Sequence, residues 1–333
     1  MAPDIHDENS AKPSQQNGII TRGVVLGIVS ALAYSLANLA LRQLSDSGSS
    51  GGHGWDLWVT AMKTVPTGVI AWFVVLNRFM RNQPAFPPLR LLPILVVAAV
   101  VMQFGGNLSF QIALGFLGLG ITVPLVFACL ICVGAVAGRI WLGDPVTIQV
   151  ASAIIVMMAA VILLSAGTVP QNSENGTPME VGAIVAGICL AAASGSSYGA
   201  VGVLIRNFVR AVLSVESMLI VFSTVGVVLL AAGAIALSGW QSIQANTVRD
   251  WPLLLAAGSA NAIAFFALAY ALREMDVNRM NVINASQNAM CAVGAVVLFQ
   301  EQLSGLAIVG IVLTIAGLLT LGWKKPSAAE DTG

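Results

Sequence analysis

Charge is scarce in this sequence. Only 9% of its 333 residues are Asp, Glu, Lys or Arg, whereas 57% are hydrophobic; soluble domains carry about 25% charged residues. So little charge excludes a soluble globular protein, because the chain could not cover a surface that faces water. The net charge of zero also argues against a nucleic-acid partner. The lipid bilayer is therefore the expected surrounding of most of the chain.

Cysteine and histidine are also rare, with four and two residues. All four cysteines lie within apolar runs, which argues against a disulfide framework. Cys129 and Cys132 form a C-x-x-C pair, but no further ligand lies nearby, so we interpret them as small packing residues. The sequence predicts neither a metal site nor a cofactor.

Long apolar runs make up most of the chain. A helix needs about 20 mainly apolar residues to cross a bilayer, and ten runs qualify. They are residues 21–42, 56–77, 90–113, 119–140, 147–166, 181–205, 214–237, 251–272, 280–299 and 304–323. We therefore predict an all-α polytopic membrane protein. The polar residues 1–20 are expected to form a disordered cytoplasmic tail rather than a cleaved signal peptide.

The basic residues predict the orientation of these helices. If both termini are cytoplasmic, twelve of the fifteen Lys and Arg residues fall on the inside, two fall outside, and Lys63 lies within a helix. Positive residues are retained on the cytoplasmic side during insertion. We therefore expect a multi-pass protein of the cell inner (plasma) membrane with both termini in the cytoplasm.

The two halves of the chain repeat weakly. At an offset of 164, matching residues recur in the same order: Ser30, Tyr34 and Arg42 correspond to Ser194, Tyr198 and Arg206. Each half has five predicted helices, an odd number, so the second half must be inverted relative to the first. We expect five-helix repeats at 21–166 and 180–324, an extracytoplasmic linker at 167–179 and a cytoplasmic tail at 325–333. Inverted repeats are typical of transporters that alternate access around a central site.

Two turns, 142–147 around Asp144 and 299–304 around Glu301, each precede the last apolar helix of a half. They resemble the G-E-x-x-T turn before the last helix of an EamA repeat. The second fits better, because the first has Asp in place of Glu and a Pro after it. Across residues 21–324, the chain resembles an EamA-domain transporter of the drug/metabolite transporter superfamily. The resemblance implies a ten-helix fold, a central cavity and metabolite export.

Polar residues recur at mid-depth in several predicted helices. Unpaired polar groups in hydrocarbon cost several kcal/mol, so such residues generally face a protein interior or a wet cavity. Hydrogen bonds between helices are the alternative for any one of them. As a set they predict a polar cavity lined by Tyr34, Asn38, Gln103, Asn107, Gln111, Ser194, Tyr198, Asn261, Asn284 and Asn288.

Lys63 is the one basic residue placed deep in a predicted helix. It either reaches toward the outer headgroups or provides a cavity cation for a carboxylate or phosphate, and Asp56 is placed to pair with it. No carboxylate or histidine lies near mid-depth of a predicted helix, which favours a facilitator or exchanger over proton coupling through Lys63 or Glu216.

We therefore predict a transporter, not an enzyme, for a small polar, zwitterionic or amphipathic metabolite. Two alternatives stay open. A passive pore or structural membrane protein would also be polytopic. The G-x-S-x-G spacing around Ser197 suggests an intramembrane serine hydrolase, although both histidines, His6 and His53, lie outside the predicted helices, and such a serine needs a base. The predicted partners are a small-molecule substrate and the bilayer.

Overall fold

The computed structural model describes residues 13–47, 52–143, 148–167, 181–211, 213–299 and 304–322. All regular structure in these ranges is helical. Among the described residues, seven segments have the length and apolarity to cross a membrane: 22–45, 52–80, 89–117, 119–142, 181–210, 215–238 and 240–274. The chain is thus a polytopic helical membrane protein, as predicted.

The first predicted half begins earlier than expected. Helix α1 (Pro13–Ser47) includes residues 13–20, so the prediction of a disordered tail over all of residues 1–20 was wrong for that part. Helices α2 (Gly52–Met62) and α3 (Val65–Met80) form one interrupted span. The next span combines η1 (Leu89–Leu91), α4 (Leu92–Val100), η2 (Val101–Leu108) and α5 (Ser109–Leu117).

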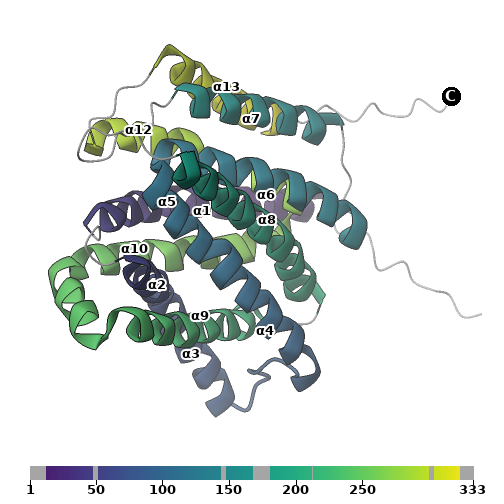
Figure 1. Ribbon diagram of the computed structural model, residues 1–333. Helices are drawn as coiled ribbons and strands as arrows, with labels where there is room; N and C mark the ends of the chain where they lie inside the picture. The colour runs from purple at the N-terminus through teal and green to yellow at the C-terminus, as the bar shows by residue number, and fades with distance from the viewer. Residues whose placement is uncertain are drawn as a thin grey trace, which may run out of the picture.

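The remaining helices follow in the predicted order. They are α6 (Leu119–Leu142), α7 (Ile148–Gly167), α8 (Val181–Ala211), α9 (Val215–Ser238), α10 (Trp240–Glu274), α11 (Val277–Asn284), α12 (Gln287–Phe299) and α13 (Gly305–Gly322). Helix α1 packs along α10, α6 along α8, and α2 and α3 against α9, while α7 and α13 pair at one edge of the bundle (Figure 1).

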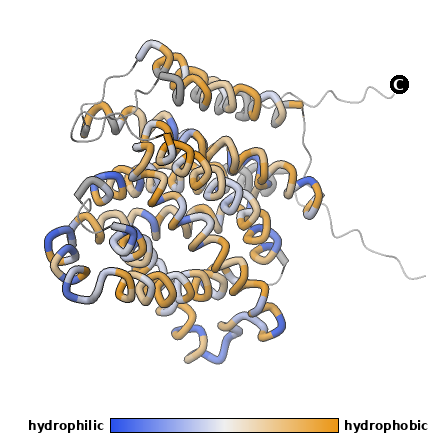
Figure 2. Tube along the Cα trace, viewed as in Figure 1, coloured by the Kyte–Doolittle hydropathy of each residue, from blue (hydrophilic) through white to orange (hydrophobic). Residues whose placement is uncertain are grey.

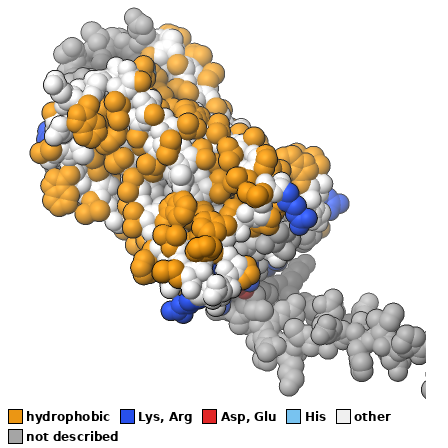
Figure 3. All heavy atoms as spheres, turned by 90° about the horizontal axis from the view of Figure 1, so that it is seen from below, with side chains coloured by type: hydrophobic (Ala, Val, Ile, Leu, Met, Phe, Trp, Pro, Cys, Tyr) orange, Lys and Arg blue, Asp and Glu red, His pale blue; other side chains and the backbone are white. Residues whose placement is uncertain are grey.

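Large apolar side chains cover much of the outer surface of the bundle. Phe73 on α3 is 71% exposed and Val97 on α4 is 62% exposed. In Figure 2 the tubes are mainly hydrophobic along the helices and hydrophilic near their ends. Figure 3 shows apolar atoms over most of one face, with Lys and Arg confined to its margins. Such a surface is suited to contact with lipid rather than water.

In the described part of the chain, regular helix is interrupted at three places within the spans predicted from the sequence. Lys63 and Thr64 form a turn between α2 and α3, where Pro66 cannot donate to the helical ladder. The segment η2 is a π-helix, and Ser109 Oγ donates to the carbonyl oxygen of Phe104 at 3.0 Å. Helices α11 and α12 are separated by a turn at Ala285. Irregular backbone at membrane depth is tolerated where it is buried in protein or borders a cavity, and all three breaks lie close to the site described next.

Candidate functional site: a polar cavity between the two halves

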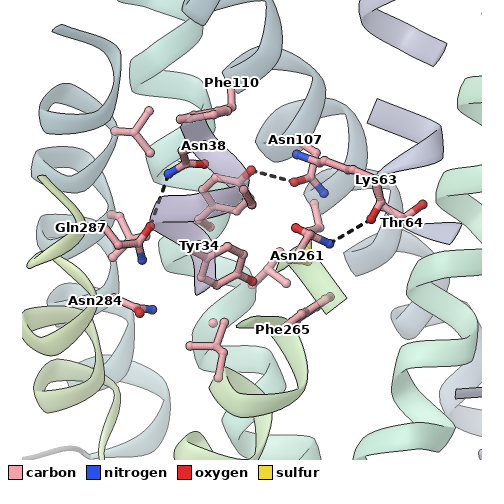
Figure 4. Close-up of a pocket in the computed structure, with 18 of the residues that line it drawn as sticks. Tyr34, Asn38, Lys63, Thr64, Asn107, Phe110, Asn261, Phe265, Asn284 and Gln287 are labelled. Atoms are coloured by element: carbon pink, nitrogen blue, oxygen red, sulfur yellow. Dashed lines mark hydrogen bonds between the residues drawn. The ribbon is translucent and has the colours of Figure 1, made fainter. Parts of the chain in front are cut away.

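A cavity of about 110 Å³ is lined by α1, the turn between α2 and α3, α3, η2, α5 and α6 from the first predicted half and by α8–α12 from the second. It is large enough for several water molecules. Helices from both predicted halves therefore provide its walls. Figure 4 shows amides, hydroxyls and aromatic rings from these helices arranged around it.

Eight of the eleven residues predicted from the sequence line this cavity. They are Tyr34, Asn38, Lys63, Gln103, Asn107, Tyr198, Asn261 and Asn284. The other three do not line it: Gln111 Nε2 donates to Ser45 Oγ at 2.6 Å, Ser194 Oγ donates to the Gly106 carbonyl at 2.9 Å, and Asn288 is buried beside the turn before α12. For Gln111 and Ser194, the geometry favours the interhelical hydrogen bond over a place in the cavity wall.

One wall of the cavity is a chain of hydrogen bonds. Tyr198 Oη donates to Asn107 Oδ1 at 2.8 Å, and Asn107 Nδ2 donates to Gln103 Oε1 at 2.9 Å. Gln103 Nε2 in turn donates to the carbonyl oxygen of Phe222 on α9 at 2.9 Å. We call Gln103, Asn107 and Tyr198 the linked wall. It ties η2, α8 and α9 together, so these polar groups hold the bundle as well as line the cavity.

Helix α11 forms a second polar wall with a different character. Asn281 and Asn284 both line the cavity and are at most 8% exposed. Asn281 Nδ2 and Asn284 Oδ1 are buried without a hydrogen-bond partner in the described part of the chain. We call these two residues the open wall. Unsatisfied buried polar atoms cost about 1–3 kcal/mol each, so hydrogen bonds stabilise this wall less than they stabilise the linked wall.

Lys63 lies in the turn between α2 and α3. Its side chain is in the cavity wall, its residue is 3% exposed, and its Nζ is 6.0 Å from the centre of the Phe110 ring. Asn261 Nδ2 donates to the Lys63 carbonyl at 3.3 Å, which satisfies an acceptor released by the helix break. In Figure 4, Lys63 and Asn107 lie on the same side of the cavity, and Asn284 lies across from them.

The expected pairing of Lys63 with Asp56 does not occur. Asp56 Oδ2 instead lies 3.6 Å from His53 Nδ1, at the beginning of α2. Glu216 is buried and contacts two other residues: its Oε2 is 3.1 Å from Arg78 Nη1, and its Oε1 accepts from the Tyr270 hydroxyl. Neither acidic residue therefore faces Lys63.

Sequence reasoning missed several lining residues. Thr64, Thr67, Ser223, Asn281 and Gln287 are polar members of the wall, and Phe110, Phe127 and Phe265 are aromatic members. Gln287 Oε1 accepts from Asn38 Nδ2 at 3.4 Å and so connects α12 to α1. The amide spacing of Asn281, Asn284 and Asn288 contained a usable signal, but no periodicity distinguishes an aromatic residue that lines a cavity from one that contacts lipid.

The G-x-S-x-G segment of α8 is a packing surface. A Cβ atom at Gly195 would lie 2.1 Å from the Val126 carbonyl oxygen, and one at Gly199 would lie 2.8 Å from the Leu130 carbonyl oxygen, so both glycines allow α6 and α8 to touch. Ser197 Oγ lies close to Gly105 of η2. Its hydroxyl thus lies at a helix contact, and the one described histidine, His53, is engaged with Asp56.

Some predictions fall outside the described residues. Asp144, Glu301, the segment 325–333 and all of the 167–179 linker except Gly167 belong to this group. Within the described ranges, no three His, Cys, Asp or Glu residues are grouped in a way that could hold a metal ion.

Comparison with known proteins supports the family suggested by the sequence. Residues 185–323 match the model of the EamA-like transporter family, so the match covers most of the predicted second repeat. The chain also resembles a protein of known crystal structure, with a TM-score of 0.64 and 18% identity over 90% of this chain and 96% of that one. At that identity the likeness shows a shared fold. No curated protein matches the chain. Residues 185–323 of this multi-pass membrane protein therefore form a segment that matches the EamA-like transporter family.

Proposed function

We propose that this chain transports a small polar, zwitterionic or amphipathic metabolite across the inner (plasma) membrane by alternating access. One observation carries the proposal: helices from both halves of the chain meet around a cavity that eight predicted polar residues line. A structural membrane protein has no need of such a cavity. The family match adds the general activity, and only the family resemblance favours export.

Helix pairing supports two inverted five-helix repeats, with α7, α11–α12 and α13 completing a set of ten spans. In such an arrangement, equivalent helices of the two repeats can face each other across a pseudo-two-fold axis. The second span of the first half, α2–α3, packs against α9, the second span of the other half. Likewise α7 packs against α13, the last helix of each half. Both pairings connect equivalent elements.

The residues that line the cavity also bear on how transport is coupled to a source of energy. Its polar groups are amides and hydroxyls together with Lys63. We propose a facilitator or exchanger whose flux follows the substrate gradient. Substrate accumulation driven by an imposed pH gradient alone, and lost in Lys63→Met or Glu216→Gln, would reject this part of the proposal.

A cavity-blocking variant tests transport even while the substrate is unidentified. Gly202 lines the cavity, and a Cβ atom there would meet nothing within 4 Å. Gly202→Phe should therefore fill the cavity without disturbing helix contacts. Gly182→Phe is the matched control, because Gly182 lies on the same helix in open space and does not line the cavity.

The measurement is the release of a mixed metabolite extract from vesicles that contain the purified protein, followed by mass spectrometry. We expect a subset of metabolites to leave vesicles with the wild-type protein and the Gly182→Phe variant, and at least about tenfold slower release with Gly202→Phe. Equal release from all three, or from protein-free vesicles, would reject transport through this cavity.

The proposed topology has its own test. Gln83, between α3 and η1, should face the cytoplasm, and Ser242, near the beginning of α10, should face outward; both are exposed. With the native cysteines replaced, an impermeant thiol reagent added outside intact cells should label Ser242→Cys but not Gln83→Cys. The reverse pattern would show that the orientation is inverted.

A further inference from the structure

The buried charge in the cavity indicates the class of substrate. This inference rests on the proposed function. Lys63 is the one charged side chain among the described residues of the cavity wall, and it is 3% exposed. An ammonium group buried in a membrane protein is costly unless an opposite charge or several hydrogen-bond acceptors compensate it. No carboxylate in the described ranges forms an ion pair with it, since Asp56 pairs with His53 and Glu216 with Arg78.

The side chains around Lys63 further restrict the class of substrate that the cavity can bind. Its Nζ lies 6.0 Å from the centre of the Phe110 ring, and Phe127 and Phe265 also line the cavity, with leucine and valine side chains between the polar groups. These walls suit an apolar or aromatic body. Asn281 and Asn284 of the open wall also line the cavity, so their amides suit a polar substituent of the ligand. In Figure 4, Asn284 lies across the cavity from Lys63, remote from the charged end.

We propose that the cavity binds a small amphipathic organic monocarboxylate whose carboxylate pairs with Lys63. A single lysine balances a single negative charge, whereas a phosphate dianion would leave a net negative charge in the cavity. A zwitterion would bring an ammonium group for which the described lining offers only neutral oxygens and aromatic faces. The apolar body lies against the phenylalanines, and hydrogen-bonding groups at its far end reach the open wall.

Probe molecules that share one apolar body but differ in charge distinguish a carboxylate ligand from a neutral, zwitterionic or phosphate ligand. The purified full-length protein is titrated calorimetrically with phenylacetate, phenylacetamide, phenylalanine and phenyl phosphate, and with hexanoate and hexanamide as an aliphatic pair. Within each acid–amide pair the body is the same and only the charge differs. We expect at least one carboxylate to bind about 10- to 100-fold more tightly than its amide, as expected for a buried hydrogen bond between charged groups. Phenylalanine and phenyl phosphate should bind more weakly than phenylacetate.

Variants of Lys63 then assign the preference to this residue. Lys63→Met keeps the length of the side chain and removes its charge, so it should bind acid and amide equally weakly. Lys63→Arg should retain the preference for the acid. The preference for acid over amide is measured on the wild-type protein and so does not depend on the folding of any variant. If Lys63→Met does not fold, Lys63→Gln serves as a second neutral replacement.

Several results would overturn the proposal: no bound carboxylate in the panel, no preference for acid over amide, a preference that survives both neutral replacements, or binding of phenyl phosphate or phenylalanine as tight as that of phenylacetate. These results are distinct from a failure of the proposed function. If neutral or zwitterionic metabolites are released from wild-type vesicles and blocked by Gly202→Phe, transport stands and only the substrate class is wrong.

Discussion

The two polar walls of the cavity have similar composition but differ in their hydrogen bonding. The linked wall satisfies its amides internally, from Tyr198 through Asn107 and Gln103 to the backbone of α9. The open wall leaves atoms of Asn281 and Asn284 without partners in the described part of the chain. A satisfied network stabilises one arrangement of helices, whereas unsatisfied buried groups cost free energy in that arrangement. Polarity alone therefore does not identify a binding residue, and an unpaired atom alone does not either, since both amide atoms of Asn288 lack a partner in the described part of the chain although Asn288 does not line the cavity.

Removing the central residue of the linked wall should have the largest effect. Gln103→Leu leaves the Phe222 carbonyl and Asn107 Nδ2 without their partner, and each unsatisfied buried group costs about 1–3 kcal/mol. We expect a lower melting temperature and less folded protein, measured by thermal unfolding and by size-exclusion chromatography in detergent. Normal stability with lost transport would instead place Gln103 among the substrate-binding residues.

Removing the hydroxyl at the end of the linked wall should lower the free energy of unfolding by a smaller amount. Tyr198→Phe keeps the ring against Gly106 and removes only the hydroxyl that donates to Asn107 Oδ1. The expected loss is about 0.5–1.5 kcal/mol, the range of a single neutral hydrogen bond. Thermal unfolding of the Tyr198→Phe and Gln103→Leu variants, measured side by side, shows which variant loses more stability. If Tyr198→Phe loses as much stability as Gln103→Leu, the hydrogen bonds of the linked wall are fully cooperative.

The open wall should show the smallest change in stability. Asn284→Leu replaces a side chain whose Oδ1 has no partner among the described residues, so we expect a melting temperature equal to or above that of the wild type. Transport in the vesicle assay should nevertheless fall, because a ligand group loses its partner. If Asn284→Leu unfolds the protein as strongly as Gln103→Leu, the distinction between the two walls is wrong.

The positions of the predicted residues show which cavity-lining residues the sequence pattern predicts correctly and which it does not. Gln103, Asn107 and Gln111 are spaced four residues apart, which would place all three on one face of a regular α-helix. The π-helix at Val101–Leu108 changes that register. Gln103 and Asn107 line the cavity, but Gln111 bonds to Ser45 on α1 instead. Ser194 and Tyr198 likewise lie one turn apart on α8, yet only Tyr198 reaches the cavity.

The sequence by itself determined the class of protein, since low charge and long apolar runs leave the bilayer as the only suitable solvent. It also determined most of the cavity, because buried polar groups must gather away from lipid. Only the tertiary structure decided which amides bond to each other and which remain open, because those contacts join residues distant in the chain, such as Gln103 and Phe222. It also decided that Lys63 faces the cavity without Asp56 as its partner, since the turn at Lys63–Thr64 and the position of His53 set those directions.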